Sequence, residues 1–258
     1  MMGARGLLTA AAAAIVAIGL AATPARAAGD AIEIPDQAWS FAGVFGTYDR
    51  GELQRGFQVY KEVCAGCHSL NYIAFRNLGD LGFNELEIKA IAAGYEVTDG
   101  PNDAGEMFTR AALPADRFPA PFANDNAARA SNGGALPPDL SLMVDARPNG
   151  ANYVYSLLTG YGDAPAGMKI AEGMNYNAYF PGHQIAMPAP LSEDGVEYAD
   201  GTKATRAQQA RDVTAFLAWA SEPNLEQRKR MGVMVMLFLL VMTGLLYASK
   251  RKIWADVH

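Results

Sequence analysis

The stretch Cys64-Ala65-Gly66-Cys67-His68 decides the fold, because it calls for a chain wrapped around a flat cofactor. Two thiols three positions apart can reach the two vinyl groups on one edge of a porphyrin, and the next residue then directs an imidazole to the iron. A CxxC pair alone would also suit a redox dithiol or half of a zinc site. The chain has 2 cysteines and 3 histidines in all, which leaves zinc short of ligands. We therefore predict one covalent haem c, attached through Cys64 and Cys67, with His68 as an iron ligand.

The second iron ligand is less constrained by the residues themselves. An open position would allow gas binding or peroxidase chemistry, a methionine would give a high-potential electron carrier, and a second histidine would lower the potential. Met187 is favoured, because the neighbouring Pro188 and Pro190 hold an extended backbone that can present a weakly binding thioether. His183 is the local competitor. The other candidates between the two apolar ends of the chain are Met107, Met143, Met168 and Met174.

The N-terminus predicts export. Residues 1–27 combine a short basic start, the apolar run 7–22 and the triplet Ala25-Arg26-Ala27, a pattern typical of a secretory signal. We expect cleavage after Ala27, with Ala28 as the second choice. A retained N-terminal anchor is the alternative interpretation.

A second apolar segment near the C-terminus predicts a membrane anchor. Residues 231–248 carry no charge, and as a helix they would span about 27 Å, close to the thickness of a bilayer core. Basic clusters at 228–230 and 250–252 leave the positive-inside rule undecided, so the export signal sets the orientation. We expect a periplasmic domain over 28–227, one transmembrane anchor over 228–249 and a cytoplasmic tail over 250–258. This places the chain in the inner membrane of a bacterium.

Charge is distributed unevenly along the chain. The whole sequence has a net charge of −6, but residues 28–227 hold 26 acidic and 13 basic side chains. Such a domain repels nucleic acid and attracts cationic proteins, with an association that weakens as salt rises. Solubility alone would explain most of these charges taken singly.

Apolar side chains at three- and four-residue spacing predict helices between long loops. The predicted helices cover residues 51–64, 84–93, 151–158 and 204–221. Residues 94–138 and 161–202 are rich in glycine, proline, asparagine and aspartate, which is typical of loops that wrap a ligand or a partner. Residues 30–45 read as an irregular aromatic arm. We therefore predict a mainly α domain with long irregular loops and one C-terminal transmembrane helix.

Several segments resemble a known family. Gly56 and Tyr60 lie eight and four residues before Cys64, as in the first helix of class I cytochromes c, and Phe216-Leu217 resembles the pair in the last helix of that fold. From about residue 38 onward the chain more specifically resembles cytochrome c1 of the cytochrome bc1 complex. The segments that carry this likeness are RGFQVY (55–60), GALPPDLS (134–141), SLLTGY (156–161), NAYFPG (177–182), SEP (221–223) and RKRMG (228–232).

The resemblance implies a set of haem contacts. It implies Met187 as the second iron ligand and leaves His183 without that role. Haem propionate contacts are implied for Arg147 and Tyr153. In the Pro137-Pro138 turn, it implies that the backbone carbonyl of Pro138 accepts a hydrogen bond from His68. It also implies that Asn132 lies close to the haem.

The sequence departs from some relatives in two ways. It has no cysteines for the disulfide that stabilises the methionine loop in some bacterial members, and it lacks a long acidic run. Its acidic side chains are densest just after Met187. We predict that this group docks a soluble basic cytochrome c, with a plain solvated loop as the alternative; its members are Glu193, Asp194, Glu197 and Asp200.

The resemblance implies one-electron transfer rather than bond-making catalysis. In this interpretation the chain accepts electrons from the Rieske iron–sulfur protein, packs beside cytochrome b in a dimeric complex, and passes electrons to the soluble cytochrome. It would be no enzyme by itself, but the haem subunit of a quinol–cytochrome c reductase. A free-standing membrane-anchored electron shuttle would share the same local motifs. A haem enzyme or gas sensor would require an open iron position.

Overall fold

The computed structural model describes residues 32–255. The predicted signal over residues 1–27 and the last three residues of the predicted tail lie outside the described residues, so both stay predictions.

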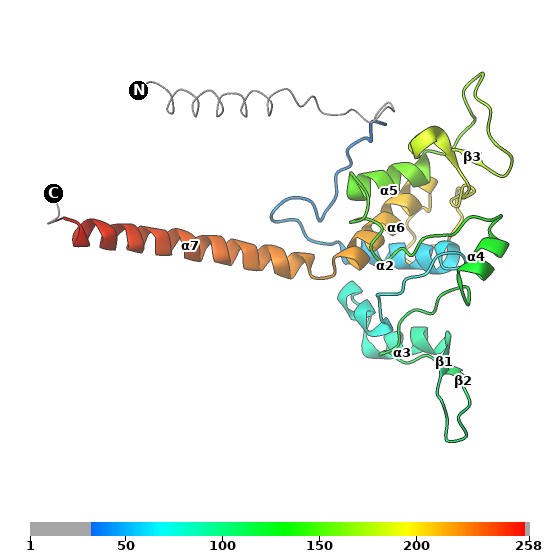
Figure 1. Ribbon diagram of the computed structural model, residues 1–258, viewed down its shortest axis with the longest axis horizontal. Helices are drawn as coiled ribbons and strands as arrows, with labels where there is room; N and C mark the ends of the chain where they lie inside the picture. Colours follow the sequence, from blue (N-terminus) through cyan, green and yellow to red (C-terminus); the bar gives the residue numbers. More distant parts are fainter. Residues whose placement is uncertain (1–31, 256–258) are drawn as a thin grey trace, which may run out of the picture. The chain divides into compact units, whose positions relative to one another are not determined.

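Helices make up most of the regular structure, which confirms the mainly α fold class (Figure 1). The helices are α2 (Arg50–Val59), α3 (Glu85–Ala93), α4 (Asp125–Ser131), α5 (Gly150–Thr159), α6 (Arg206–Ser221) and α7 (Leu225–Ile253). Shorter helical turns are the π-helical turn η1 (Tyr60–Cys64) and the 3-10 turns η2 (Phe75–Leu81) and η3 (Pro181–His183). Two small antiparallel sheets pair β1 (Glu96–Asp99) with β2 (Phe108–Ala111), and β3 (Asn175–Tyr176) with β4 (Gln184–Ile185).

Region 94–138 is more regular than we predicted. The β1–β2 hairpin is held at its base by Arg110, which donates hydrogen bonds to the carboxylates of Asp99 and Asp116. Helix α4 begins where the side chain of Asn124 accepts a hydrogen bond from the amide of Ala127 at 3.0 Å. Elements this short lack the repeated spacing that a periodicity argument needs, so the prediction of an irregular loop throughout was wrong.

The core forms where α2 crosses α6, with α5 packed against α6 (Figure 1). Gly56 stands at the crossing: a methyl group there would lie 2.0 Å from the carbonyl oxygen of Asp212 and 2.7 Å from Cβ of Phe216. Around this contact, the ring of Phe216 lies 5.8 Å from that of Phe57 and 5.6 Å from that of Tyr60, centroid to centroid. The crossing is therefore close enough to require glycine, and it positions the helix that leads into the CxxCH motif.

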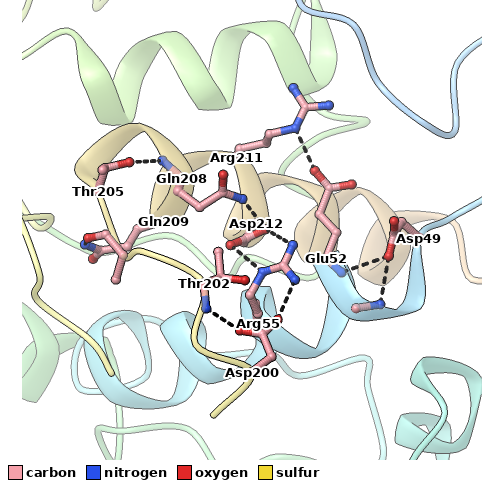
Figure 2. A network of polar contacts seen from close by, with 12 residues as sticks. Asp49, Glu52, Arg55, Asp200, Thr202, Thr205, Gln208, Gln209, Arg211 and Asp212 are labelled. Atoms are coloured by element: carbon pink, nitrogen blue, oxygen red, sulfur yellow. Dashed lines mark hydrogen bonds and ion pairs between the residues drawn. The ribbon is translucent and has the colours of Figure 1, made fainter. Parts of the chain in front are cut away.

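A polar network flanks the same crossing (Figure 2). Arg55 donates from Nε and Nη2 to both carboxylate oxygens of Asp212, each at 3.1 Å, and from Nη1 to Asp200 at 2.9 Å. Burial raises the pKa of Asp212, and the Arg55 guanidinium opposes that rise. Nearby, Arg211 pairs with the buried Glu52 at 2.9 Å. The fork of Arg55 thus ties the loop that contains Asp200 to both core helices.

The C-terminal helix α7 runs without interruption over 29 residues. Its most apolar window of 18 residues has a mean hydropathy of 2.3 and is not buried inside the protein. It is long and apolar enough to cross a membrane, as predicted for this segment. The helix begins at Leu225, three residues before the predicted anchor.

Candidate functional site

The CxxCH motif follows a change in helical geometry at the end of α2. In η1 the helix widens, and the amide of Ala65 donates to the carbonyl of Tyr60, five residues earlier, at 2.8 Å. The chain then turns sharply, so that the amides of Cys67 and His68 both donate to the carbonyl of Cys64, at 3.1 and 2.9 Å. Cys64 is half-buried, Cys67 is exposed, and the two do not form a disulfide with each other. Such π turns are frequent at functional sites.

The imidazole of His68 is held by a backbone carbonyl. Its Nδ1 lies 2.7 Å from the carbonyl oxygen of Pro138, which can only accept, so Nδ1 carries the proton. The lone pair of Nε2 is then free for a metal. Burial lowers the pKa of His68, although the hydrogen bond to Pro138 opposes the shift. A neutral, oriented imidazole is the form that binds iron.

A strap over residues 138–141 holds this arrangement. Asp139 accepts hydrogen bonds from Oγ of Ser69 at 2.7 Å and from the amide of Asn71 at 2.8 Å, and the amide of Leu140 donates to the carbonyl of Ser69 at 2.9 Å. Partial burial acts to raise the pKa of Asp139. The hydrogen bonds that its carboxylate accepts, including one from Ser141, outweigh burial and keep this pKa below its usual range. No role for Asp139 follows from the sequence alone, although the residue lies in the segment 134–141 that carries the family resemblance.

Met187 lies on a loop whose backbone is anchored from two sides. Its carbonyl oxygen accepts a hydrogen bond from the hydroxyl of Tyr161 at 3.1 Å and one from Nδ2 of Asn175 at 3.4 Å. Burial raises the pKa of Tyr161, so the hydroxyl stays a donor. The half-buried side chain of Met187 is therefore presented by a backbone that is tied to β3 and to the end of α5.

The same loop is fastened to α5 through Asn177. This buried side chain donates to the carbonyl of Leu157 at 2.8 Å and accepts from the amides of Tyr179 and Phe180 at 3.0 and 3.2 Å. Gly160 allows the close approach, since a methyl group there would lie 2.5 Å from Cδ2 of Tyr179. Neither Tyr161 nor Asn177 received a role from our reading of the sequence; both lie inside segments that carried the family resemblance.

The structure brings Arg147 and Tyr153 together near that anchor. Burial raises the pKa of Tyr153, and the adjacent Arg147 guanidinium opposes the rise. Tyr153 also raises the pKa of Tyr161, after burial. A cation and a phenol at one place suit a carboxylate such as a haem propionate.

The remaining predicted residues make other contacts. Asn132 caps the end of α4 by donating from Nδ2 to the carbonyl of Ala128 at 2.7 Å. His183 stacks on Tyr176, with ring centroids 6.0 Å apart. The four acidic side chains after Met187 are all exposed, and Asp200 is in addition ion-paired with Arg55; the other three are Glu193, Asp194 and Glu197.

Comparisons with known proteins agree on one family. The sequence model of the Cytochrome C1 family matches residues 39–257. The cytochrome c1 of Rhodospirillum rubrum is 51% identical, with 94% of each chain covered. A mitochondrial cytochrome c1 heme protein of Arabidopsis thaliana is 53% identical over 86% of this chain and 72% of its own. The cytochrome b/c1 of Bradyrhizobium diazoefficiens is 51% identical over 87% of this chain, which spans only 36% of that longer protein.

Proposed function

Because this chain belongs to the cytochrome c1 family, we propose that it relays single electrons through its haem c from the Rieske iron–sulfur protein to a soluble c-type cytochrome. In this role it is the haem-bearing subunit of a cytochrome bc1 complex, and the quinol chemistry belongs to other subunits. Haem c, when bound, supplies an iron that changes its charge by one electron. The protein supplies attachment, ligands and exclusion of water.

The residues present fit that cofactor. Cys64 and Cys67 would attach the haem through thioether bonds, and His68 and Met187 would hold its iron. The observation that carries the proposal is the anchoring of both ligand segments. The carbonyl of Pro138 orients the His68 ring, and the hydroxyl of Tyr161 holds the backbone of Met187. Rigid ligands that need not move between the two iron states are what fast electron transfer requires.

Further residues complete the proposed haem pocket. Arg147 and Tyr153 would bind a haem propionate together. The guanidinium of Arg147 supplies a positive charge, and the phenol of Tyr153 supplies a hydroxyl beside it. Asn132 keeps its proposed approach to the haem, although its amide also caps α4.

We expect Tyr161→Phe to loosen the methionine ligand without removing it. The loss of one hydrogen bond to the Met187 carbonyl destabilises the loop that presents the ligand by about 1 kcal/mol. Cyanide binds the oxidised haem by displacing methionine, so its affinity should rise roughly fivefold. Cyanide titration of the oxidised haem measures this change. Tyr155→Phe on α5, the helix that precedes Tyr161, is the control, because the Tyr155 ring packs against Trp39 instead. Equal cyanide affinities in both variants would remove Tyr161 from the ligand support.

The proposed partners follow from the family and the membrane helix. Cytochrome b lies beside α7 and the Rieske protein delivers electrons, within a dimeric complex in the inner membrane of a bacterium. The relative named cytochrome b/c1 supports the first of these pairings. We place the haem domain, residues 28–227, in the periplasm, the anchor over 228–249 and the tail over 250–258, following a cleaved signal over 1–27. Purification in mild detergent tests the assembly. A haem-loaded chain that came away from membranes free of cytochrome b would favour the free-standing shuttle instead.

Acidic side chains after the Met187 loop are the proposed contact for a basic soluble cytochrome c. Buried Leu191, Val196 and Tyr198 pin this segment to the core, so the acids between them point outward. We expect joint replacement of the three exposed acids to slow electron transfer at low salt by about tenfold and to flatten its salt dependence. The changes are Glu193→Gln, Asp194→Asn and Glu197→Gln.

The matched control for this prediction is Asp200→Asn. Asp200 is ion-paired with Arg55, although that arginine also pairs with Asp212, so we expect this variant to change the rate less than Glu193→Gln alone. Rapid-mixing kinetics with a basic cytochrome across a range of ionic strengths measure these rates. An electron-transfer rate that did not depend on salt, or that was unchanged by the triple replacement, would show that the partner docks elsewhere.

A further inference from the structure

The arm loop, residues 41–47, is an uncharged turn between Trp39-Ser40 and α2. Val44 is 63% exposed and Phe45 is 85% exposed, although both are large apolar side chains. Two such neighbours at the tip of a turn are costly in water and mark a surface that is covered in the working protein. The question is which partner covers it.

The arm loop is held in one shape by the start of α7. Lys229 donates from Nζ to the carbonyl oxygens of Phe41 at 2.5 Å and Gly46 at 3.2 Å. The turn is closed by the amide of Thr47, which donates to the carbonyl of Ser40 at 3.1 Å. Just beyond it, the amide of Tyr48 donates to Glu226 at 2.8 Å. Val44 and Phe45 are therefore presented by a fixed scaffold.

Hollows lined by both the arm loop and α7 show how far along the helix the tip of the loop reaches. Phe45 lines a hollow together with Val233 and Met234, and Val44 lines a groove together with Met236 and Leu240. All four α7 residues lie inside the uncharged run that begins at residue 231. At 1.5 Å per residue, Met234 is about 5 Å along the helix from the start of that run. The tip therefore reaches past the basic residues 228–230 to the level where α7 enters hydrocarbon.

We propose that the arm loop is a second membrane contact, in which Val44 and Phe45 enter the phospholipid bilayer in the leaflet where α7 begins. This inference rests on the proposed membrane-spanning role of α7. A lipid surface fits better than a protein, because Lys229 already occupies the loop carbonyls of Phe41 and Gly46 and the tip offers no polar or charged group for specific pairing. The basic residues 228–230 then lie at the level of the phosphate headgroups. The bilayer is also continuous with the exposed apolar face of α7 itself.

This contact would restrict the tilt of the haem domain. Trp39 links the arm to the core, since its Nε1 donates to Asn152 of α5 at 2.7 Å and its ring lies under the guanidinium of Arg211 of α6 at 5.1 Å. A domain attached to the bilayer at both α7 and the arm loop can swing less than one attached at α7 alone. The orientation of the haem toward partners on the same membrane follows from that restriction.

Spin labelling of the full haem-loaded chain in phospholipid nanodiscs tests the proposal. The native cysteines are consumed by haem attachment, so Phe45→Cys offers one site for a nitroxide. We expect this label to collide with dissolved oxygen, which concentrates in lipid, rather than with a water-soluble nickel chelate. Met107→Cys is the control in water, because Met107 is a 61% exposed apolar residue in the β1–β2 turn. Val241→Cys, in the middle of α7, is the control in lipid.

The controls separate failure of this inference from failure of the proposed anchor. A Phe45 label as open to the chelate as the Met107 label, with Val241 in lipid, would overturn the arm-loop contact alone. A Val241 label open to the chelate would overturn the membrane-spanning role of α7. The haem absorption spectrum of each variant reports whether it is folded.

A crosslinking experiment in native membranes distinguishes a lipid contact from a protein partner. A photoreactive benzoyl analogue of phenylalanine at position 45 should crosslink to phospholipid, which adds the mass of one lipid to the chain. A crosslink from position 45 to another subunit would show that a protein covers the loop, and would overturn the proposal.

Discussion

Replacing Met187 by leucine is expected to abolish the far-red methionine–iron absorption band of the oxidised protein. Leucine has nearly the volume of methionine but no lone pair, so the iron loses its neutral sulfur ligand while the packing stays. The loop itself should persist, because Tyr161 and Asn175 hold the backbone carbonyl at 187 rather than its side chain. We also expect the reduction potential to fall by on the order of 0.1 V and the reduced protein to bind carbon monoxide.

Other methionines and His183 serve as controls for this assignment. Met174→Leu lies in the same loop region and should leave both the absorption band and the potential unchanged. His183→Ala should do likewise, since its ring stacks on Tyr176. If the band survived in Met187→Leu, or disappeared in Met174→Leu, the ligand would have to be sought at another methionine. Carbon monoxide binding by the parent protein would instead favour an open iron position.

The second large effect is expected at Gly56. A methyl group in Gly56→Ala would lie 2.0 Å from the Asp212 carbonyl, which belongs to the backbone of α6 and cannot rotate away. The helices must separate, which disturbs the packing of Phe57 and Tyr60 on Phe216. We expect a loss of about 3 kcal/mol in the free energy of unfolding, and no stable fold for Gly56→Val. Helix propensity alone would make alanine more stable by about 1 kcal/mol, so the sign of the change is diagnostic.

Denaturant unfolding of the haem-loaded chain, followed by haem absorption, measures this effect. Gly79→Ala is the control, because the added methyl group would lie at an ordinary contact distance of 3.7 Å from Cδ1 of Ile88 and the residue lies outside the CxxCH motif. Its stability should stay within about 0.5 kcal/mol of the parent protein. A Gly56→Ala protein as stable as the parent would mean that the two helices cross with more space than the contact implies.

Local spacing predicted much of the fold. The helices over 85–93, 150–159 and 206–221 agree with their predicted ranges to within two residues. The buried face of a helix shows in the sequence as apolar residues at three- and four-residue spacing, which is a local signal. Region 94–138 was harder to predict. Its hairpin depends on Arg110 reaching Asp99 and Asp116, a set of contacts that no periodic pattern reveals.

The acidic group after Met187 shows a different limit. In the sequence its four members look equivalent, because each is an acid in a polar loop. The fold distinguishes one of them, since Arg55 on α2 pairs with Asp200, although all four side chains are exposed. Charge counting along a chain cannot detect this pairing, because its partners are 145 positions apart.

The motif from Cys64 to His68 was enough by itself to predict haem attachment, because the thiols and the imidazole must be neighbours in the chain to reach one edge and the centre of one porphyrin. The tertiary structure decided how the ligand segments are held. The carbonyl that orients His68 lies 70 positions away at Pro138, and the hydroxyl that holds the Met187 backbone comes from Tyr161 at the end of another helix. It also decided that an apolar turn near the N-terminal side of the domain is fixed against α7 by Lys229. Covalent chemistry is local in sequence, whereas the rigidity of ligands and surfaces comes from packing between distant segments.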